Sequence, residues 1–281
     1  MGERKPGRPT TVVIGLGNPI LRDDGVGFSV AEAVRGRLDG RRAEVVQACA
    51  GGFRLLETLA GRRRAVLVDA VRLGGRPGEV YRLSAEDFRG SIRAASPHEA
   101  GLPEALALGR QLGMEMPEVV VVGIEPAETE EFGEGLTPAV AAAIPEAAAL
   151  VLAEAEPDLA AAVRERAKEG RLPCADAFAL ARRWHLAPRQ VADFAAGLGL
   201  RVGWCSLGLF AGSKKEARPR PEAGTVPPAL RQAIEEGLEE GRLPCARAWA
   251  IAKRLGLERL EVGRAAEALG IRISRCQLGC F

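Results

Sequence analysis

The sequence lacks any run that approaches the roughly 20 apolar residues of a membrane-spanning helix. The basic start, MGERKPGRPT, is not followed by the apolar stretch and small-residue cleavage site of a signal peptide. The six cysteines are too few and too scattered for a disulfide scaffold, and they fit a reducing compartment better. We therefore expect a cytoplasmic protein with no membrane partner.

Signatures of nucleotide binding are also missing. Residues 15–27 read GLGNPILRDDGVG after an apolar run, but the third glycine of G-x-G-x-x-G is absent. No acidic residue ends the second expected strand, where QACAGG stands, and no G-K-[ST] occurs. Asp23 and Asp24 at a helix entrance would repel a pyrophosphate. This glycine-rich loop is therefore not predicted to hold a phosphate.

Charge divides the chain into two parts. Residues 1–156 contain 18 Lys and Arg against 23 Asp and Glu, a balance of −5, and the remainder contains 21 against 14, a balance of +7. An acidic part joined to a basic part predicts two regions with different partners.

Apolar strand-like segments alternate with helical patterns in residues 1–156. This alternation predicts an α/β fold, a mostly parallel twisted sheet with helices on both faces. Thr137 and Pro138 are expected to cap and open the last helix. The expected strands are 11–17, 43–50, 65–71, 78–84 and 118–126, and the expected helices are 26–38, 52–60, 102–112 and 136–156.

The remainder contains a duplication with no clear strands. A segment beginning at Glu169 aligns without gaps to one beginning at Glu240, a lag of 71 residues that pairs Cys174 with Cys245 and Cys205 with Cys276. We expect two small all-α, helix-turn-helix-like modules, 157–210 and 229–281, joined by a Pro- and Gly-rich linker, 211–228.

Two interpretations of these modules stay open. Arg189, Arg259 and Arg264 on the second helices allow DNA binding, although neither copy has a dense basic face, and docking to another protein is the preferred alternative. The cysteines of each copy, with Cys280 added in the second, are read as small buried residues. Zinc or Fe–S ligation would need about four thiolates from both copies, and neither copy has a C-x2-C pair.

Three chemically active residues lie at or beyond the carboxyl ends of expected strands in the first region. Because ligands gather at the carboxyl ends of parallel strands, Asp24, Asp69 and His98 could converge. Two carboxylates and an imidazole suit a divalent metal such as nickel or zinc, and they equally suit acid–base catalysis. Simpler roles remain: Asp24 in a turn with Gly25, Asp23 as a helix cap, and His98 as a surface residue.

Four motifs in order, GLGNPILRDDGVG at 15–27, VDA at 68–70, S-x-H-x-x-G-L at 96–102 and VVGIEPAETEEFGEGLTPAV at 121–140, resemble the hydrogenase maturation protease family. The resemblance covers roughly residues 11–156 and implies a peptidase that trims the C-terminal extension of a nickel–iron hydrogenase large-subunit precursor. It implies that Asp24, Asp69 and His98 contact nickel carried by the substrate, with no permanent metal. Asn18, Asp23, Gly51 and Gly52 would lie near the cleft, with Asp23 only capping a helix.

The attacking group is not settled by these residues. A carboxylate base and a metal-bound water are both compatible with them, whereas no Ser–His or Cys–His arrangement is evident. Cys49 is interpreted as a small core residue. Peptidyl-tRNA hydrolases share the GLGNP opening but not the residues that follow it. With this resemblance, another maturation protein is the preferred partner of the two helical modules, ahead of DNA. The alternative function is a metal-state sensor or regulator with a DNA- or protein-binding, helix-turn-helix-like tail.

Overall fold

The computed structural model describes residues 9–49, 55–87, 102–210, 224 and 226–281. The chain forms two compact units, each described by itself: residues 1–161 with 197–199, and residues 162–196 with 200–281. The division falls within helix α5 (Pro157–Arg166).

The first unit is built on a five-stranded sheet in the order β2-β1-β3-β5-β4. The parallel strands are β1 (Thr11–Leu16), β2 (Ala43–Ala48), β3 (Arg64–Ala70) and β5 (Glu118–Ile124), and β4 (Val80–Ser84) is an antiparallel edge. The central strands are apolar almost throughout, as expected of strands covered on both faces. The predicted strands and the mostly parallel sheet are confirmed.

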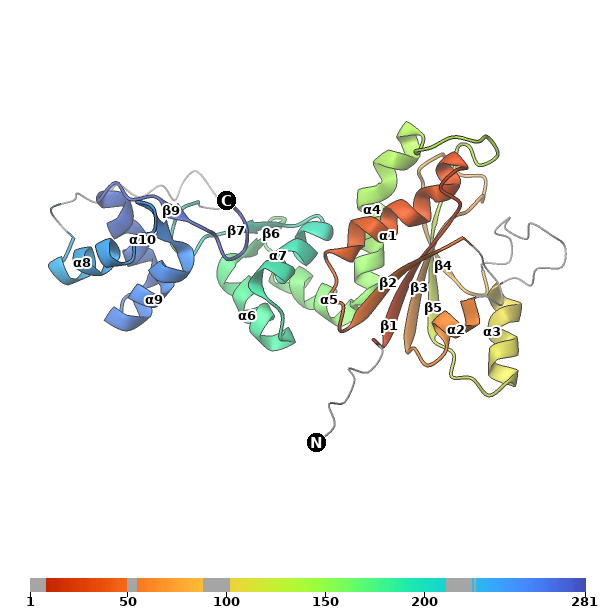
Figure 1. Cartoon of the computed structure of the whole chain (residues 1–281), viewed down its shortest axis with the longest axis horizontal. Helices are drawn as coiled ribbons and strands as arrows, with labels where there is room; N and C mark the ends of the chain where they lie inside the picture. Colours follow the sequence, from red (N-terminus) through yellow and green to blue (C-terminus); the bar gives the residue numbers. More distant parts are fainter. Residues whose placement is uncertain (1–8, 50–54, 88–101, 211–223, 225) are drawn as a thin grey trace. The chain divides into compact units, whose positions relative to one another are not determined.

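Helices cover both faces of this sheet (Figure 1). Helices α1 (Val26–Arg35) and α4 (Pro138–Ala155) pack together on one face. Helices α2 (Leu56–Leu59) and α3 (Leu102–Gln111) lie on the other, where Leu59 and Leu106 pack against Ile14 and Leu67. Since side chains alternate along a strand, Val13 and Val66 face α1 and α4 instead.

Two glycines bring α1 unusually close to the sheet. A Cβ on Gly27 would lie 2.1 Å from the carbonyl oxygen of Leu16 and 2.3 Å from that of Val68, and one on Gly15 would lie 2.3 Å from the carbonyl oxygen of Gly27. Gly15 and Gly27 therefore allow α1 to pack closely onto the ends of β1 and β3.

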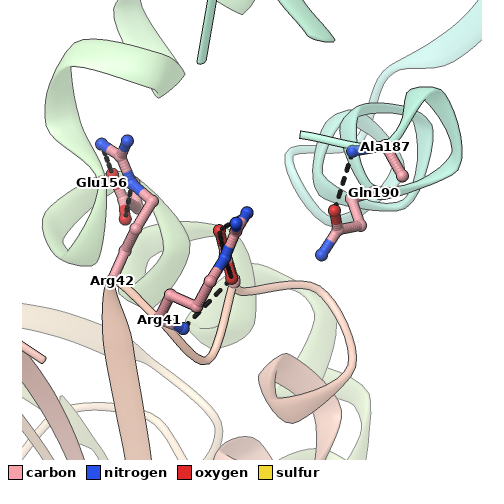
Figure 2. Close-up of polar contacts among 6 residues, drawn as sticks. Arg41, Arg42, Glu156, Ala187 and Gln190 are labelled. Atoms are coloured by element: carbon pink, nitrogen blue, oxygen red, sulfur yellow. Dashed lines mark hydrogen bonds and ion pairs between the residues drawn. The ribbon is translucent and has the colours of Figure 1, made fainter. Parts of the chain in front are cut away.

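An ion pair fastens the end of α4 to the start of β2. Arg42 donates through Nε and Nη2 to the two carboxylate oxygens of Glu156, both at 2.8 Å (Figure 2). The paired geometry fixes both side chains, and Glu156 is buried. Burial raises the cost of breaking such a pair above that of a fully exposed one.

Among the described residues, α4 is the one helix long and apolar enough to span a membrane. Its buried side chains pack against α1 and the sheet. The length and apolar composition of α4 therefore fit a helix buried in the core as well as they fit a membrane-spanning one.

The second unit contains two repeats of the same element order. The first has β6 (Arg171–Pro173), α6 (Cys174–Trp184), α7 (Pro188–Gly197) and β7 (Arg201–Gly203). The second has β8 (Leu243–Pro244), α9 (Cys245–Leu255), α10 (Arg259–Ala268) and β9 (Ile273–Ser274), preceded by α8 (Pro228–Glu236). Each pair of short strands is parallel, so the expectation of all-α modules is wrong. Two or three residues per strand are too few to produce an alternation signal.

Each repeat does contain the expected helix–turn–helix pair. The first helix ends in a left-handed residue, His185 in one copy and Gly256 in the other. The next helix opens with the N–H of Ala187 donating to Gln190 (2.9 Å; Figure 2), and the equivalent Glu258 forms a capping box.

Two of the three arginines proposed for DNA are engaged inside the unit. Arg189 pairs with Asp193 at 2.9 Å, and the Arg259 guanidinium lies 3.4 Å from the Trp249 ring centroid. The Asp193 carboxylate offsets the charge of Arg189, and the Trp249 ring already occupies one face of the Arg259 guanidinium.

Candidate active site

The direction in which strands are added to the sheet reverses at β1. The chain leaves β1 for β2 on one side and then returns to β3 on the other, with α1 and α2 on opposite faces. Such a reversal of strand order is where open α/β sheets bind ligands. Asp24 follows β1 and Asp69 lies near the end of β3, so the fold brings both carboxylates to this edge.

Asp69 is a buried carboxyl. Its side chain is 1% exposed, and one of its oxygens accepts the N–H of Ala70 at 3.0 Å. Burial raises the pKa of Asp69 to about 7, because an ionised carboxylate loses its hydration there. By strand alternation it lies on the same face as Ala65 and Leu67, the face covered by α2 and α3.

Asp24 is half-buried in the short 3-10 helix η1 (Arg22–Gly25), which packs against β3. One of its carboxylate oxygens accepts the backbone N–H of Asn18 at 3.1 Å. Asn18 in turn accepts the N–H of Ile20 through its side-chain oxygen at 3.3 Å. These bonds shape the loop that presents Asp24 at the carboxyl edge of the sheet.

Asp23 points away from solvent, and its exposure is 0%. Its two oxygens accept four hydrogen bonds, from the N–H groups of Ala127, Glu128 and Thr137 and from the Thr137 hydroxyl, at 2.7–3.0 Å. Helix α1 has no side-chain cap, so the expectation that Asp23 caps it is wrong. Thr137 stands at the N-cap of α4, and its hydroxyl binds Asp23 rather than the helix.

Glu125 was not singled out by the sequence, although it lies within the last of the four motifs. It is 5% exposed and accepts the N–H groups of Leu73 (2.8 Å) and Gly74 (3.3 Å) and the Tyr81 hydroxyl (3.0 Å). Burial alone would raise the pKa of this carboxyl, but these hydrogen bonds outweigh burial and lower it. Its place directly after β5 was the signal that could have found it.

Hydrogen bonds join the loops after β1, β3 and β5 into one rim. The N–H of Gly133 donates to the Ile20 carbonyl at 3.0 Å, and Arg72 donates to the Thr129 hydroxyl at 2.8 Å. Each loop also carries an exposed apolar side chain: Ile20 (52% exposed), Leu73 (55%) and Phe132 (81%). The rim therefore offers apolar contacts beside the carboxylates.

Three expected site residues, His98, Gly51 and Gly52, lie outside the described residues. Cys49 is exposed rather than part of the core, so that expectation is wrong. It directly follows β2, an edge strand that is only partly buried.

Fold and site together define an α/β protein with carboxylates at the switch point of its sheet, an arrangement suited to a cation-bearing ligand. The family model for hydrogenase maturation proteases matches residues 8–154. The Hydrogenase 2 maturation protease of Escherichia coli K12 is 32% identical over 145 residues, which are 50% of this chain and 88% of that protein. The chain belongs to the hydrogenase maturation protease family, a family of peptidases.

Other relatives also match only about half of this chain. The hydrogenase expression/formation protein HupD of Thiocapsa roseopersicina is 29% identical over 136 residues, which are 47% of this chain and 61% of the relative. Among solved structures, the maturating endopeptidase HybD of E. coli has 31% identity and a TM-score of 0.46, with coverage of 53% of this chain and 92% of that one. The family model ends at residue 154, so the second unit lies beyond it.

Proposed function

We propose that the first unit is the endopeptidase that removes the C-terminal extension of a nickel-loaded [NiFe] hydrogenase large-subunit precursor. Asp24, Asp69 and His98 would complete the coordination of nickel that the precursor already carries. That contact would report that metal insertion is finished and would hold the scissile peptide bond at this end of the sheet.

The observation that carries this proposal is the placement of Asp24 and Asp69 at the switch point of the sheet. Carboxylate oxygens and an imidazole are suitable ligands for a metal of intermediate hardness. A buried carboxyl such as Asp69 costs free energy when it ionises, and a bound cation offsets that cost. Nickel arriving with the substrate would therefore favour the ionised form at the moment of recognition.

Peptide hydrolysis also needs proton transfer. Water adds to the carbonyl carbon and loses a proton, the carbon–nitrogen bond breaks, and the leaving amine gains a proton. A carboxylate of the site or a water polarised by the substrate's nickel could begin this sequence.

We expect Asp24→Asn and His98→Ala each to lower trimming of a nickel-loaded precursor by about 100-fold or more, because each removes a ligand or a proton acceptor from the site. Incubation of full-length protein with the precursor, followed by mass spectrometry of the intact large subunit, measures the trimmed fraction.

Asp39→Asn provides the matched control. Asp39 lies in the turn before β2, at the amino ends of the parallel strands and away from the site, and pairs with Arg41. Full trimming by Asp24→Asn would overturn the site assignment. Binding of the precursor by the wild type without any trimming would favour the metal-state sensor instead.

Phe132→Ala is expected to raise KM for the precursor by about tenfold with kcat little changed, since a single aromatic contact contributes uniformly to substrate and transition state. Phe132 is 81% exposed, so its removal should leave thermal stability unchanged. Initial trimming rates at several precursor concentrations separate the two constants.

Leu112→Ala is the control for that measurement. Leu112 is also an exposed apolar residue (66%), but it follows α3 and precedes β5 at the opposite edge of the sheet. Equal effects of the two substitutions would rule out the rim as the substrate-binding surface.

A further inference from the structure

Five of the six cysteines line one hollow in the second unit. They are Cys174 and Cys205 of the first repeat and Cys245, Cys276 and Cys280 of the second. Cys174 and Cys245 are buried, Cys205 and Cys276 are partly buried, and all are free thiols. The sequence separates these residues by up to 106 positions, so the fold alone brings them together.

The short strand pairs explain how each repeat contributes two of these cysteines. In the first repeat Pro173 pairs with Gly203, and the ladder therefore places the following segments, with Cys174 and Cys205, side by side. In the second repeat Pro244 pairs with Ser274, which does the same for Cys245 and Cys276. Each ladder thus ends in a pair of thiols.

The two repeats face one another through equivalent contacts. Phe178 stacks on Trp249, its counterpart 71 residues later, with ring centroids 4.1 Å apart. A Cβ on Gly208 would meet Leu260 at 2.5 Å, and one on the equivalent Gly279 would meet Arg189, the counterpart of Leu260. Reciprocal contacts of this kind define an approximate two-fold relation. The two cysteine pairs are therefore related to each other by that two-fold.

Backbone geometry is specialised at the second cysteine of each repeat. Trp204 and Arg275, which directly precede Cys205 and Cys276, both have left-handed backbones, with φ of 42° and 49°. A left-handed backbone is strained in every residue type except glycine, and residues with such strain are frequent at functional sites. The same unfavourable conformation occurs in both copies, which argues for a requirement on where the thiol points.

Hydrogen-bond donors surround the sulfur atoms. Backbone N–H groups of Leu207 and Leu209 are directed at the Cys205 sulfur. The side-chain amide of Gln277 donates to the Cys245 sulfur at 3.7 Å. Donors of this kind stabilise thiolates that ligate metals and tune their electronic properties.

We propose that Cys174, Cys205, Cys245 and Cys276 form one tetrathiolate site for a thiophilic metal centre, either a single zinc ion or an iron–sulfur cluster. Four thiolates satisfy both types of centre. Among the described residues no three His, Cys, Asp or Glu side chains are arranged to hold a metal ion, so these thiols would have to rotate to bind one. This site is independent of the peptidase function proposed for the first unit.

The test uses full-length protein, reduced and freed of metal with a chelator under anaerobic conditions. One portion is titrated with Co²⁺, a spectroscopic substitute for zinc, and another is incubated with sulfide and a mixture of ferrous and ferric iron, because iron–sulfur clusters contain ferric iron. We expect one portion to show thiolate-to-metal absorption that saturates at one centre per chain. Intense visible bands of tetrahedral cobalt would identify a zinc-type site, and cluster absorption with matching iron and sulfide content would identify an iron–sulfur site.

Cys174→Ser and Cys276→Ser, one in each repeat, should each weaken binding by about tenfold or more. Cys49→Ser, in the other unit, should bind as the wild type does. Circular dichroism checks folding of the variants, and the wild-type titration stands even if a variant fails to fold. Absence of thiolate absorption with both probes, or unchanged binding by both site variants, would overturn the proposal.

Discussion

Asp69→Asn is expected to make the protein more stable at pH 8 while it abolishes trimming of the precursor. The carboxyl is buried near the end of β3, where ionisation is unfavourable, and asparagine keeps its shape without its charge. A functional group held in an unfavourable environment commonly lowers stability, so removing it stabilises the fold and destroys the site.

The sign and size of the effect follow from the pKa. The carboxyl titrates near its ordinary value of 3.8 in the unfolded chain and at about 7 when folded. Below pH 3.8 Asp69 is protonated in both states and carries no penalty. Between these values the folded state holds the extra proton, so stability falls as pH rises, and above pH 7 the full penalty of about 4 kcal/mol applies.

Urea unfolding of wild type and Asp69→Asn at pH 5 and pH 8 measures this difference. The variant should gain more at pH 8 than at pH 5, because the wild type loses stability between them. Asp24→Asn, an equivalent change at a half-buried neighbour, is the control: it keeps Asp69 and should therefore lose stability between pH 5 and pH 8 as the wild type does. Identical pH dependence in wild type and Asp69→Asn would show that Asp69 does not titrate in this range.

The architecture of the first unit could be predicted because its signals are local and repeated. Strands such as 11–16 and 118–124 are apolar runs bounded by turns, and the alternation with helices leaves few topologies. The placement of Asp24 and Asp69 at one edge followed from the rule for parallel sheets. The periodicity of the sequence and the topology rules were therefore sufficient to predict the strands and the position of these two carboxylates.

Details that depend on partners distant in sequence could not be predicted. Asp23 resembles Asp24 in the sequence, but it is buried by a loop more than 100 residues away. The cysteines of the second unit have no recognisable ligand spacing, because strand pairing and the two-fold relation of the repeats bring them together. In each case a tertiary contact decides the role of the residue.

Asp23 is expected to have a structural role and its neighbour Asp24 a role in the site, and substitution of each tests this difference. We expect Asp23→Asn to lower the free energy of unfolding by about 4 kcal/mol, although the side chains have nearly the same shape. All four groups that face Asp23 are donors. An asparagine amide offers one oxygen and one NH2 group, so at least one buried donor would face another donor.

Thermal unfolding of the two variants side by side measures the contrast. Asp23→Asn should lower Tm by roughly 10 °C, given about 2–4 °C per kcal/mol for a domain of this size. Asp24→Asn should keep Tm near that of wild type and lose trimming instead. Thr137→Val, which removes only the hydroxyl bond to Asp23, should lower stability by about 1 kcal/mol. A stable Asp23→Asn would contradict the structural role of Asp23 and return it to the candidates for contact with the substrate.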